Sequence, residues 1–229
     1  MSREAVSDRI CLAGPNTECQ ALRMLGVVAA RITNSTSAWA HAGILYRSKK
    51  EIRFFELRTH RKLTDEPIKD DPRRPSIVWV EPRIQPERAT LVIAKCRLVM
   101  KHYKENTLPY GFRYSRTSFD EHGTLHLGSS EVGLTCATIV DAVFTSEGLR
   151  LLDPSKWPPP DDEDKRLRRA VIADIRTRDP EHAALLEAEI DAPRIRPEEV
   201  VAAAAIHPTV GTFDTLLDGA AVVAASIGL

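Results

Sequence analysis

A proline-rich and acidic segment divides this chain of 229 residues into two parts. The segment is DPSKWPPPDDEDK at residues 153–165, and it carries four of the fifteen prolines followed by a run of acidic side chains. Because proline has a fixed φ and no backbone N–H, such a run favours an extended linker. We therefore predict a domain over residues 1–152, a linker over residues 153–165 and a C-terminal extension over residues 166–229.

The part before the linker combines helical and strand patterns. Residues 19–32 (CQALRMLGVVAARI) have helical apolar spacing, and residues 86–103 predict a second helix that opens on a proline. Residues 40–47 (AHAGILYR) and 51–57 (EIRFFEL) are rich in branched and aromatic side chains around a short polar break, which predicts a β-hairpin. Residues 76–81 (SIVWVE) predict a third strand.

The part after the linker is expected to be helical. Residues 164–178, 180–190 and 197–207 each open with a helix-start signal, and two of them have proline in the first turn. The region after residue 209 is apolar enough to pack against the main domain or a second copy. We therefore predict an α+β fold, with a small antiparallel sheet or half-barrel packed on helices and a helical C-terminal extension.

Charge and cysteine content restrict the function and the location. The formal net charge is zero, with 32 basic and 32 acidic residues, so we predict no nucleic-acid partner. The four cysteines are widely spaced without a CxxC pair, which argues against a disulfide framework or a zinc site. No signal-peptide pattern opens the sequence, and its apolar end is too short to span a bilayer. We predict a cytoplasmic protein without a transmembrane segment, or one delivered by a secretion apparatus.

A single cysteine, Cys136, stands where a helix is predicted to begin, after the unpatterned residues 106–133. A helix N-terminus favours the thiolate, which is the nucleophilic form, through unpaired N–H groups and the macrodipole. The same N–H groups can bind a developing oxyanion. The alternative is a core residue, because free cysteines are often buried as small hydrophobic side chains. Cys96, inside an aliphatic helix, fits that second description.

A nucleophilic cysteine needs a base, and His41 is the first candidate among seven histidines. It lies at the start of the predicted strand WAHAGILY. Ala42 and Gly43 beside it are expected to leave room for a substrate to approach the backbone. A histidine at a strand end can also be merely exposed or hydrogen-bonded, so His41 needs partners to count as a base.

Glu56 is the candidate that would orient the imidazole of His41. It follows two phenylalanines in the neighbouring predicted strand, and a buried carboxylate there needs a partner because an isolated buried charge is costly. His60 is a rival for this third position, and His122 and His126 are weaker rivals.

The order of strand histidine, acidic residue and helix cysteine resembles the circularly permuted branch of the NlpC/P60 papain-like superfamily. Residues 37–46 (SAWAHAGILY) are similar to the family's Trp-Ser-His-Val-Gly-Ile strand, and residues 54–57 (FFEL) to its next strand with an acidic residue. Residues 108–112 (LPYGF) are similar to its Tyr-Asp-Phe turn. Residues 134–140 (LTCATIV) are similar to its Tyr-Cys-Ser-Glu-Leu helix start.

The resemblance covers roughly residues 19–152 and implies a papain-like fold with Cys136 as nucleophile, His41 as base and Glu56 as third polar residue. It implies a cysteine hydrolase, a peptidase or amidase, that cleaves an amide or related acyl bond through a thioester. No metal or organic cofactor is implied. The substrate classes implied are a peptidoglycan peptide, a protein isopeptide and a lipid ester.

The sequence departs from the family pattern beside the cysteine. Thr135 replaces a tyrosine, and Ala137-Thr138 replace Ser-Glu. If the family's tyrosine helps bind the oxyanion, Tyr110 or the backbone alone must do so here. The alternative function is therefore a catalytically degraded papain-like scaffold that acts as a binding or regulatory module. In that case the C-terminal helices would bind a partner protein or form a homo-oligomer.

Overall fold

The structure of the chain, a computed structural model, describes residues 6–13, 21–33, 38–49, 51–68, 77–105, 107–115 and 117–229. These residues form a mixed α+β fold, as predicted, with a six-stranded antiparallel sheet in the order β1-β6-β2-β3-β4-β5. Its strands are β1 (Cys11–Ala13), β2 (Leu25–Thr33), β3 (Ala38–Ser48), β4 (Glu51–Thr59), β5 (Lys62–Pro67) and β6 (Ile77–Val80). The helices are α2 (Pro86–His102), α3 (Cys136–Ser146), α4 (Asp162–Arg176), α5 (Pro180–Glu187), α6 (Pro197–Ile206) and α7 (Phe213–Ser226).

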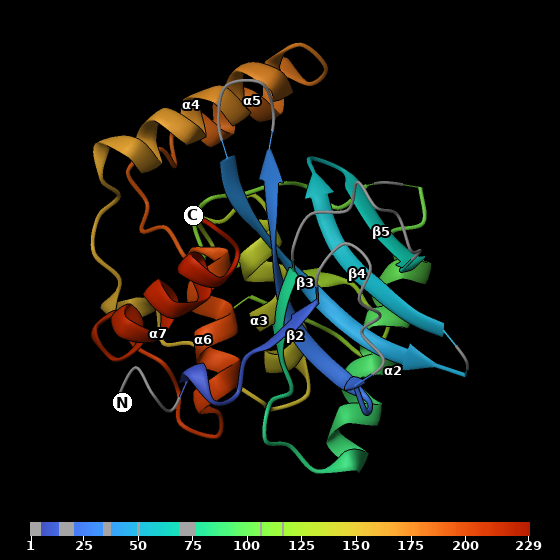
Figure 1. Cartoon of the computed structure of the whole chain (residues 1–229). Helices are drawn as coiled ribbons and strands as arrows, with labels where there is room; N and C mark the ends of the chain where they lie inside the picture. Colours follow the sequence, from blue (N-terminus) through green and yellow to red (C-terminus); the bar gives the residue numbers. More distant parts are fainter. Residues whose placement is uncertain are drawn as a thin grey trace.

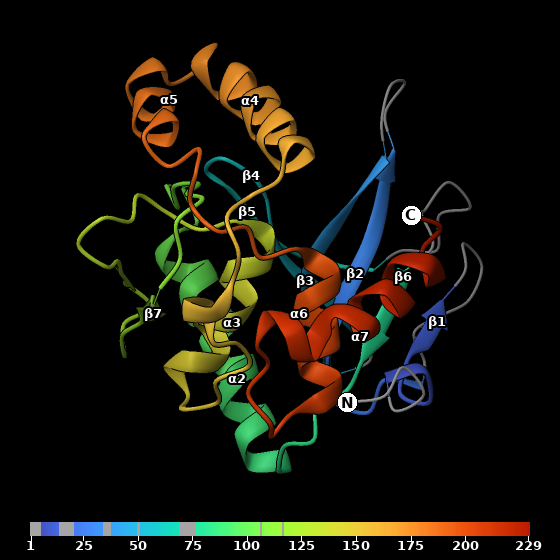
Figure 2. The same ribbon diagram turned by 90° about the vertical axis from the view of Figure 1, so that its left-hand side faces the viewer.

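Four helices, α2, α3, α6 and α7, lie on one side of the sheet (Figure 1). Helix α3 lies against β3 and β4 and contacts α2, while α6 lies against β2 and β3 and carries α7 on its outer side. Their apolar side chains and those of the sheet form one core. Helices α4 and α5 pack on each other and lie apart from the other four, beyond the end of β4 (Figure 2).

The helix predicted over residues 19–32 is wrong in its described part, because residues 25–33 form strand β2. This strand pairs with β3 on one side and β6 on the other, so it is central. Val27 and Ala29 enter the main core, while Val28 and Ala30 enter a smaller apolar cluster on the opposite face. A strand buried on both faces has a continuous apolar run without alternation, which periodicity cannot separate from a helix. Cys19 lies outside the described residues.

The predicted hairpin is confirmed as β3 and β4, and the predicted third strand as β6. The pairing of β3 with β4 runs from Ser48–Glu51 to Ile44–Phe55, so His41 and Glu56 lie beyond the last pair. The expectation that Gly43 leaves room for a substrate is wrong. A Cβ on Gly43 would lie 2.3 Å from the Phe54 ring, which shows that β4 itself occupies this space.

The predicted extended linker, residues 153–165, contains more regular structure than its prolines indicate. It opens with a 3-10 helix, η2 (Pro154–Lys156), and its acidic run forms the start of α4. Asp161 caps this helix by accepting a hydrogen bond of 2.7 Å from the Asp164 N–H. Carboxylates in a first helical turn complement the positive end of the macrodipole, which explains why the acidic run is helical.

The three helices predicted after the linker are confirmed as α4, α5 and α6, and the predicted helix at residues 86–103 is confirmed as α2. The apolar region after residue 209 forms α7, which packs on α6. Because α6 is buried in the same core as the sheet, this part of the C-terminal region packs with the main domain.

The described part of residues 106–133 contains a short hairpin, β7 (Ser118–Phe119) and β8 (Leu125–His126). The buried carboxylate of Glu131 organises the segment around it. It accepts hydrogen bonds from the Ser115 N–H and hydroxyl, both at 2.6 Å, from the Gly128 N–H at 2.8 Å, and from the Thr117 hydroxyl. One buried side chain therefore supplies contacts that regular structure would otherwise give.

Candidate active site

Cys136 occupies the first position of helix α3, as the sequence predicts. Thr135 is the N-cap, and its hydroxyl accepts a hydrogen bond of 3.1 Å from the Thr138 N–H. The Thr138 hydroxyl in turn accepts one of 2.7 Å from the Thr135 N–H, which completes a capping box. Ala137 is buried in the core. The residues that depart from the family pattern thus start the helix and fill the core behind it.

Two glycines bring Tyr110 to the start of this helix. The Gly111 N–H donates to Leu134 O and the Leu134 N–H to Pro109 O, both at 3.1 Å, so the two segments run side by side. A Cβ on Gly133 would lie 2.3 Å from Pro109 O, a separation that only glycine permits. At this close approach, the Cys136 N–H hydrogen-bonds the hydroxyl group of Tyr110.

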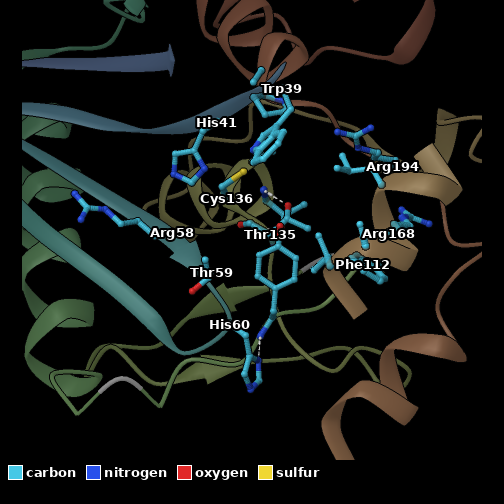
Figure 3. Close-up of a pocket in the computed structure, with 18 of the residues that line it drawn as sticks. Trp39, His41, Arg58, Thr59, His60, Phe112, Thr135, Cys136, Arg168 and Arg194 are labelled. Atoms are coloured by element: carbon cyan, nitrogen blue, oxygen red, sulfur yellow. Dashed lines mark hydrogen bonds between the residues drawn. The ribbon is translucent and has the colours of Figure 1, made fainter. Parts of the chain in front are cut away.

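The structure brings Cys136, His41 and Glu56 together. The Nε2 atom of His41 lies 2.7 Å from Oε2 of Glu56, and the side chain of His41 also hydrogen-bonds the sulfur of Cys136. Figure 3 shows the imidazole beside the sulfur atom, and His41 lies near the start of strand β3. Because Nε2 contacts the carboxylate, Nδ1 is the nitrogen left to contact the sulfur. Glu56, and not the rival His60, therefore contacts the imidazole.

Glu56 is held on its other side by two neighbours. Its Oε1 atom accepts hydrogen bonds from the Arg58 guanidinium and, at 3.3 Å, from the Thr64 hydroxyl. Burial opposes the charge of this carboxylate, but His41 and then Arg58 lower its pKa below the ordinary value. Glu56 is therefore ionised, with Oε2 directed at the imidazole.

The charges of the cysteine and the histidine are coupled. Burial by itself disfavours a charged imidazole, but Cys136 and then Glu56 raise the pKa of His41 well above its ordinary value. Burial likewise opposes a thiolate, yet His41 lowers the pKa of Cys136, with smaller contributions from the Ala42 N–H and the Arg194 charge. The favoured state is therefore a thiolate–imidazolium pair.

A cavity of about 470 Å³ opens at the sulfur. On one side it is lined by Cys136, His41 and Trp39, and on the facing side by Arg168 and Arg194 (Figure 3). Its size is within the range of about 300–1,000 Å³ typical of small-molecule sites. A ligand in this cavity would contact the thiolate directly.

A second cluster, which the sequence analysis missed, surrounds His60. Its Nδ1 atom accepts a hydrogen bond of 3.2 Å from the Tyr110 N–H, and its Nε2 atom lies 3.2 Å from Asp179 Oδ2. His182 stacks on His60 with the ring centroids 4.3 Å apart, and its Nε2 atom lies 2.6 Å from Tyr110 O. Two histidines thus hold both backbone groups of Tyr110. The sequence signal for the position of His182 was the Asp-Pro-Glu-His helix start. Asp179 caps this helix by accepting a hydrogen bond from the His182 N–H.

The remaining candidates lie elsewhere. His122 and His126 are exposed and lie near Glu121 and Asp120 respectively. Cys96 is fully buried, and burial raises its pKa well above the ordinary value, as expected of a core thiol. Within the described residues, no group of three or more His, Cys, Asp or Glu side chains is arranged to hold a metal ion.

Comparison with known proteins finds no relative. No protein-family model matches the chain, and neither a curated protein nor a solved structure matches it. Among the helices of the described residues, we also find none that is long and apolar enough to cross a bilayer. What the chain does must therefore be inferred from the geometry of its own residues.

Proposed function

We propose that this chain is a papain-like cysteine hydrolase that cleaves an amide or related acyl bond. The observation that supports this most strongly is the position of His41, buried between the thiol of Cys136 and the carboxylate of Glu56. A nucleophile, a base and an acceptor that orients the base are the parts required for thiol catalysis. The start of a buried helix against an antiparallel sheet is the place where a papain-like enzyme would carry its thiol.

In the first step, the Cys136 thiolate attacks the carbonyl carbon of the substrate and forms a C–S bond. The imidazolium of His41 then gives its proton to the leaving amine or alcohol as the bond from carbon to that group breaks. The product of this half-reaction is a thioester on Cys136. Glu56 keeps its negative charge and holds the imidazole in position.

The oxyanion of this step would lie between the Cys136 N–H and the Tyr110 hydroxyl. These two groups hydrogen-bond each other in the free protein, so both lie at the start of helix α3. Burial and then the charge of Cys136 raise the pKa of Tyr110, which keeps its hydroxyl protonated and able to donate. Tyr110 thus supplies the donor that Thr135 cannot.

In the second step, water attacks the thioester carbon, and neutral His41 accepts the proton of that water. The C–S bond breaks, a carboxylic acid leaves, and Cys136 returns to the thiolate. No metal or organic cofactor enters either step.

The test is covalent labelling by an acyl-chloromethyl-ketone probe, combined with turnover of p-nitrophenyl acetate. We expect Cys136→Ala to lose both, because the sulfur is the attacking atom. Cys11→Ser is the matched control, since Cys11 is half-buried on β1 at the far edge of the sheet and should leave both unchanged. Undiminished labelling and turnover in Cys136→Ala would disprove the proposal.

A titration of the alkylation rate against pH separates the enzyme from the degraded scaffold. A hydrolase should show an inflection well below about 8.5, the ordinary cysteine value, because His41 stabilises the thiolate. A binding module with an inert thiol would give an inflection near the ordinary value.

A further inference from the structure

The C-terminal region, which the family resemblance does not cover, supplies one wall of the cavity at Cys136. Helix α4 lines it with Leu167, Ala170, Val171 and Asp174. These positions are spaced i, i+3, i+4 and i+7, so they form one face of the helix. Leu167 and Val171 are only half-buried because this face points into the cavity and not into the core.

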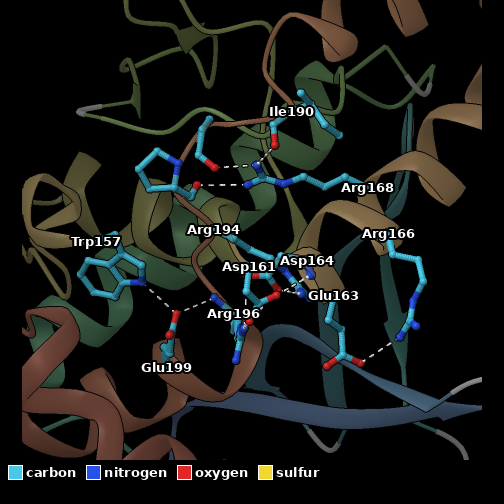
Figure 4. Close-up of polar contacts among 12 residues, drawn as sticks. Trp157, Asp161, Glu163, Asp164, Arg166, Arg168, Ile190, Arg194, Arg196 and Glu199 are labelled. Atoms are coloured by element: carbon cyan, nitrogen blue, oxygen red, sulfur yellow. Dashed lines mark hydrogen bonds and ion pairs between the residues drawn. The ribbon is translucent and has the colours of Figure 1, made fainter. Parts of the chain in front are cut away.

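Polar contacts fix α4 in this position (Figure 4). The buried guanidinium of Arg168 donates to the carbonyl oxygens of Ile190, Ala192 and Pro193, at 2.8, 2.5 and 3.1 Å. At the start of the helix, Arg196 contacts Asp164 at 3.1 Å. Because buried charge-assisted hydrogen bonds are strong and directional, the wall is a fixed part of the site.

Most of the uncharged side chains in the lining are apolar, while Thr59, Tyr110, Thr135 and Thr138 are polar. The large apolar side chains are those of Leu167, Val171 and Ile175 on α4, together with Trp39, Phe112 and Ile195 from other elements. A buried peptide would need a partner for each N–H and C=O group, and aliphatic side chains on α4 offer none. A hydrocarbon chain needs no such partners.

The three arginines in the lining already bind protein groups. Arg58 pairs with Glu56 and, at 3.2 Å, with Glu66. Arg194 pairs with the buried carboxylate of Asp164, and Arg168 binds the backbone carbonyls described above. The charges of Arg58 and Arg194 are therefore compensated by carboxylates, and the Arg168 guanidinium is hydrogen-bonded to carbonyl oxygens before a ligand enters, which favours an uncharged ligand over a charged peptide.

We propose that this cavity is an acyl pocket, and that the substrate is an ester, thioester or amide of an apolar aliphatic acid. The hydrocarbon chain would lie against the α4 face, with its carbonyl carbon at the Cys136 sulfur. This rests on the proposed function and narrows its substrate class. The chemical step is the one given above: the acyl group moves from its alcohol, thiol or amine to sulfur, and then to water.

The experiment measures kcat/KM for p-nitrophenyl esters from acetate to decanoate. We expect an increase of about 4-fold for each added methylene until the chain fills the cavity. Val171→Trp should fill the pocket and lower the decanoate-to-acetate ratio by at least about 10-fold. Ala173→Trp is the matched control, because Ala173 is an exposed residue of α4 outside the cavity lining, and its ratio should equal that of the wild type. Leu167→Phe, a smaller change on the same face, replaces Val171→Trp if that variant does not fold.

The outcomes distinguish a failure of the acyl-pocket proposal from a failure of the proposed hydrolase function. Acetate turnover that requires Cys136 but does not increase with chain length would overturn the acyl pocket and leave the hydrolase standing. A decanoate-to-acetate ratio in Val171→Trp equal to that of the wild type would overturn the acyl pocket as well. If Cys136→Ala shows that no turnover depends on the thiol, calorimetric binding of N-methyl decanamide to that variant still tests the pocket. Binding that Val171→Trp abolishes supports it, and absence of binding overturns it.

Discussion

Two buried histidines, His41 and His60, line the same cavity, each beside a carboxylate, yet the structure shifts their pKa values in opposite directions. His41 lies 2.7 Å from Glu56, and His60 lies 3.2 Å from Asp179. Burial opposes protonation of both, but the pKa of His41 is raised while that of His60 is lowered. A carboxylate neighbour therefore does not decide by itself whether an imidazole is charged.

The other neighbours make the difference. The second nitrogen of His41 contacts the Cys136 thiolate, so anions lie on both sides of its ring. The second nitrogen of His60 accepts a hydrogen bond from the Tyr110 N–H, which requires it to be unprotonated. His182 and Arg61 add unfavourable positive charge next to it. His41 is thus suited to proton transfer, and His60 to holding Tyr110 in place.

The largest expected difference between the two is in turnover. His41→Ala should lower kcat/KM for p-nitrophenyl acetate by about 10³-fold, because it removes both the base and the partner of the thiolate. Circular dichroism would show whether the variant is folded. His60→Ala should lower kcat/KM far less. Equal losses of kcat/KM in the two variants would contradict the assignment of different roles.

An intermediate effect is expected from Glu56→Gln, which keeps the shape of the side chain but removes its charge. We expect a loss of about 10²-fold in kcat. The thiolate–imidazolium pair exists at a pH above the lowered pKa of Cys136 and below the raised pKa of His41. Because Glu56 helps to raise the pKa of His41, the alkaline limb of the pH–rate profile should move to lower pH. An unchanged alkaline limb would show that the carboxylate does not set the charge of the imidazole.

The smallest effect is expected from His60→Gln, and it concerns stability. The pKa of folded His60 lies below the ordinary value of 6.5, so the unfolded chain binds this proton more readily. Its contribution to stability is therefore present above about pH 6.5 and is lost as the pH falls through and below that value. Loss of the contact between His60 and His182 should lower Tm by about 2–4 °C at neutral pH.

Thermal unfolding between pH 7 and pH 5 provides the measurement. Over this range, Tm should fall more in the wild type than in His60→Gln, because glutamine does not titrate. The nearby groups that also titrate or carry charge are Asp179, Arg61 and His182, and all three are unchanged in the variant. Parallel curves for the two proteins would show that His60 is not the group responsible.

Much of the local structure could be predicted from the sequence. The hairpin and the proline-initiated helices depend on contacts between residues close in the chain or on intrinsic φ preferences. The order of His41, Glu56 and Cys136 is read directly from the sequence. The capping box of Thr135 and Thr138 is equally local. These features follow from short-range chemistry, which the sequence displays directly.

Other features were decided only by the tertiary structure. Strand β2 has the apolar spacing of a helix and is a strand because β3 and β6 pair with it on both sides. Glu56 was predicted as the third residue with His60 as a rival, and only the pairing of β3 with β4 placed the carboxylate of Glu56 at His41. The stacking of His60 on His182 joins residues more than a hundred positions apart in the chain, and so does the cavity that brings α4 to His41 on β3. Such contacts depend on how whole elements pack, and no local pattern in this sequence encodes that packing.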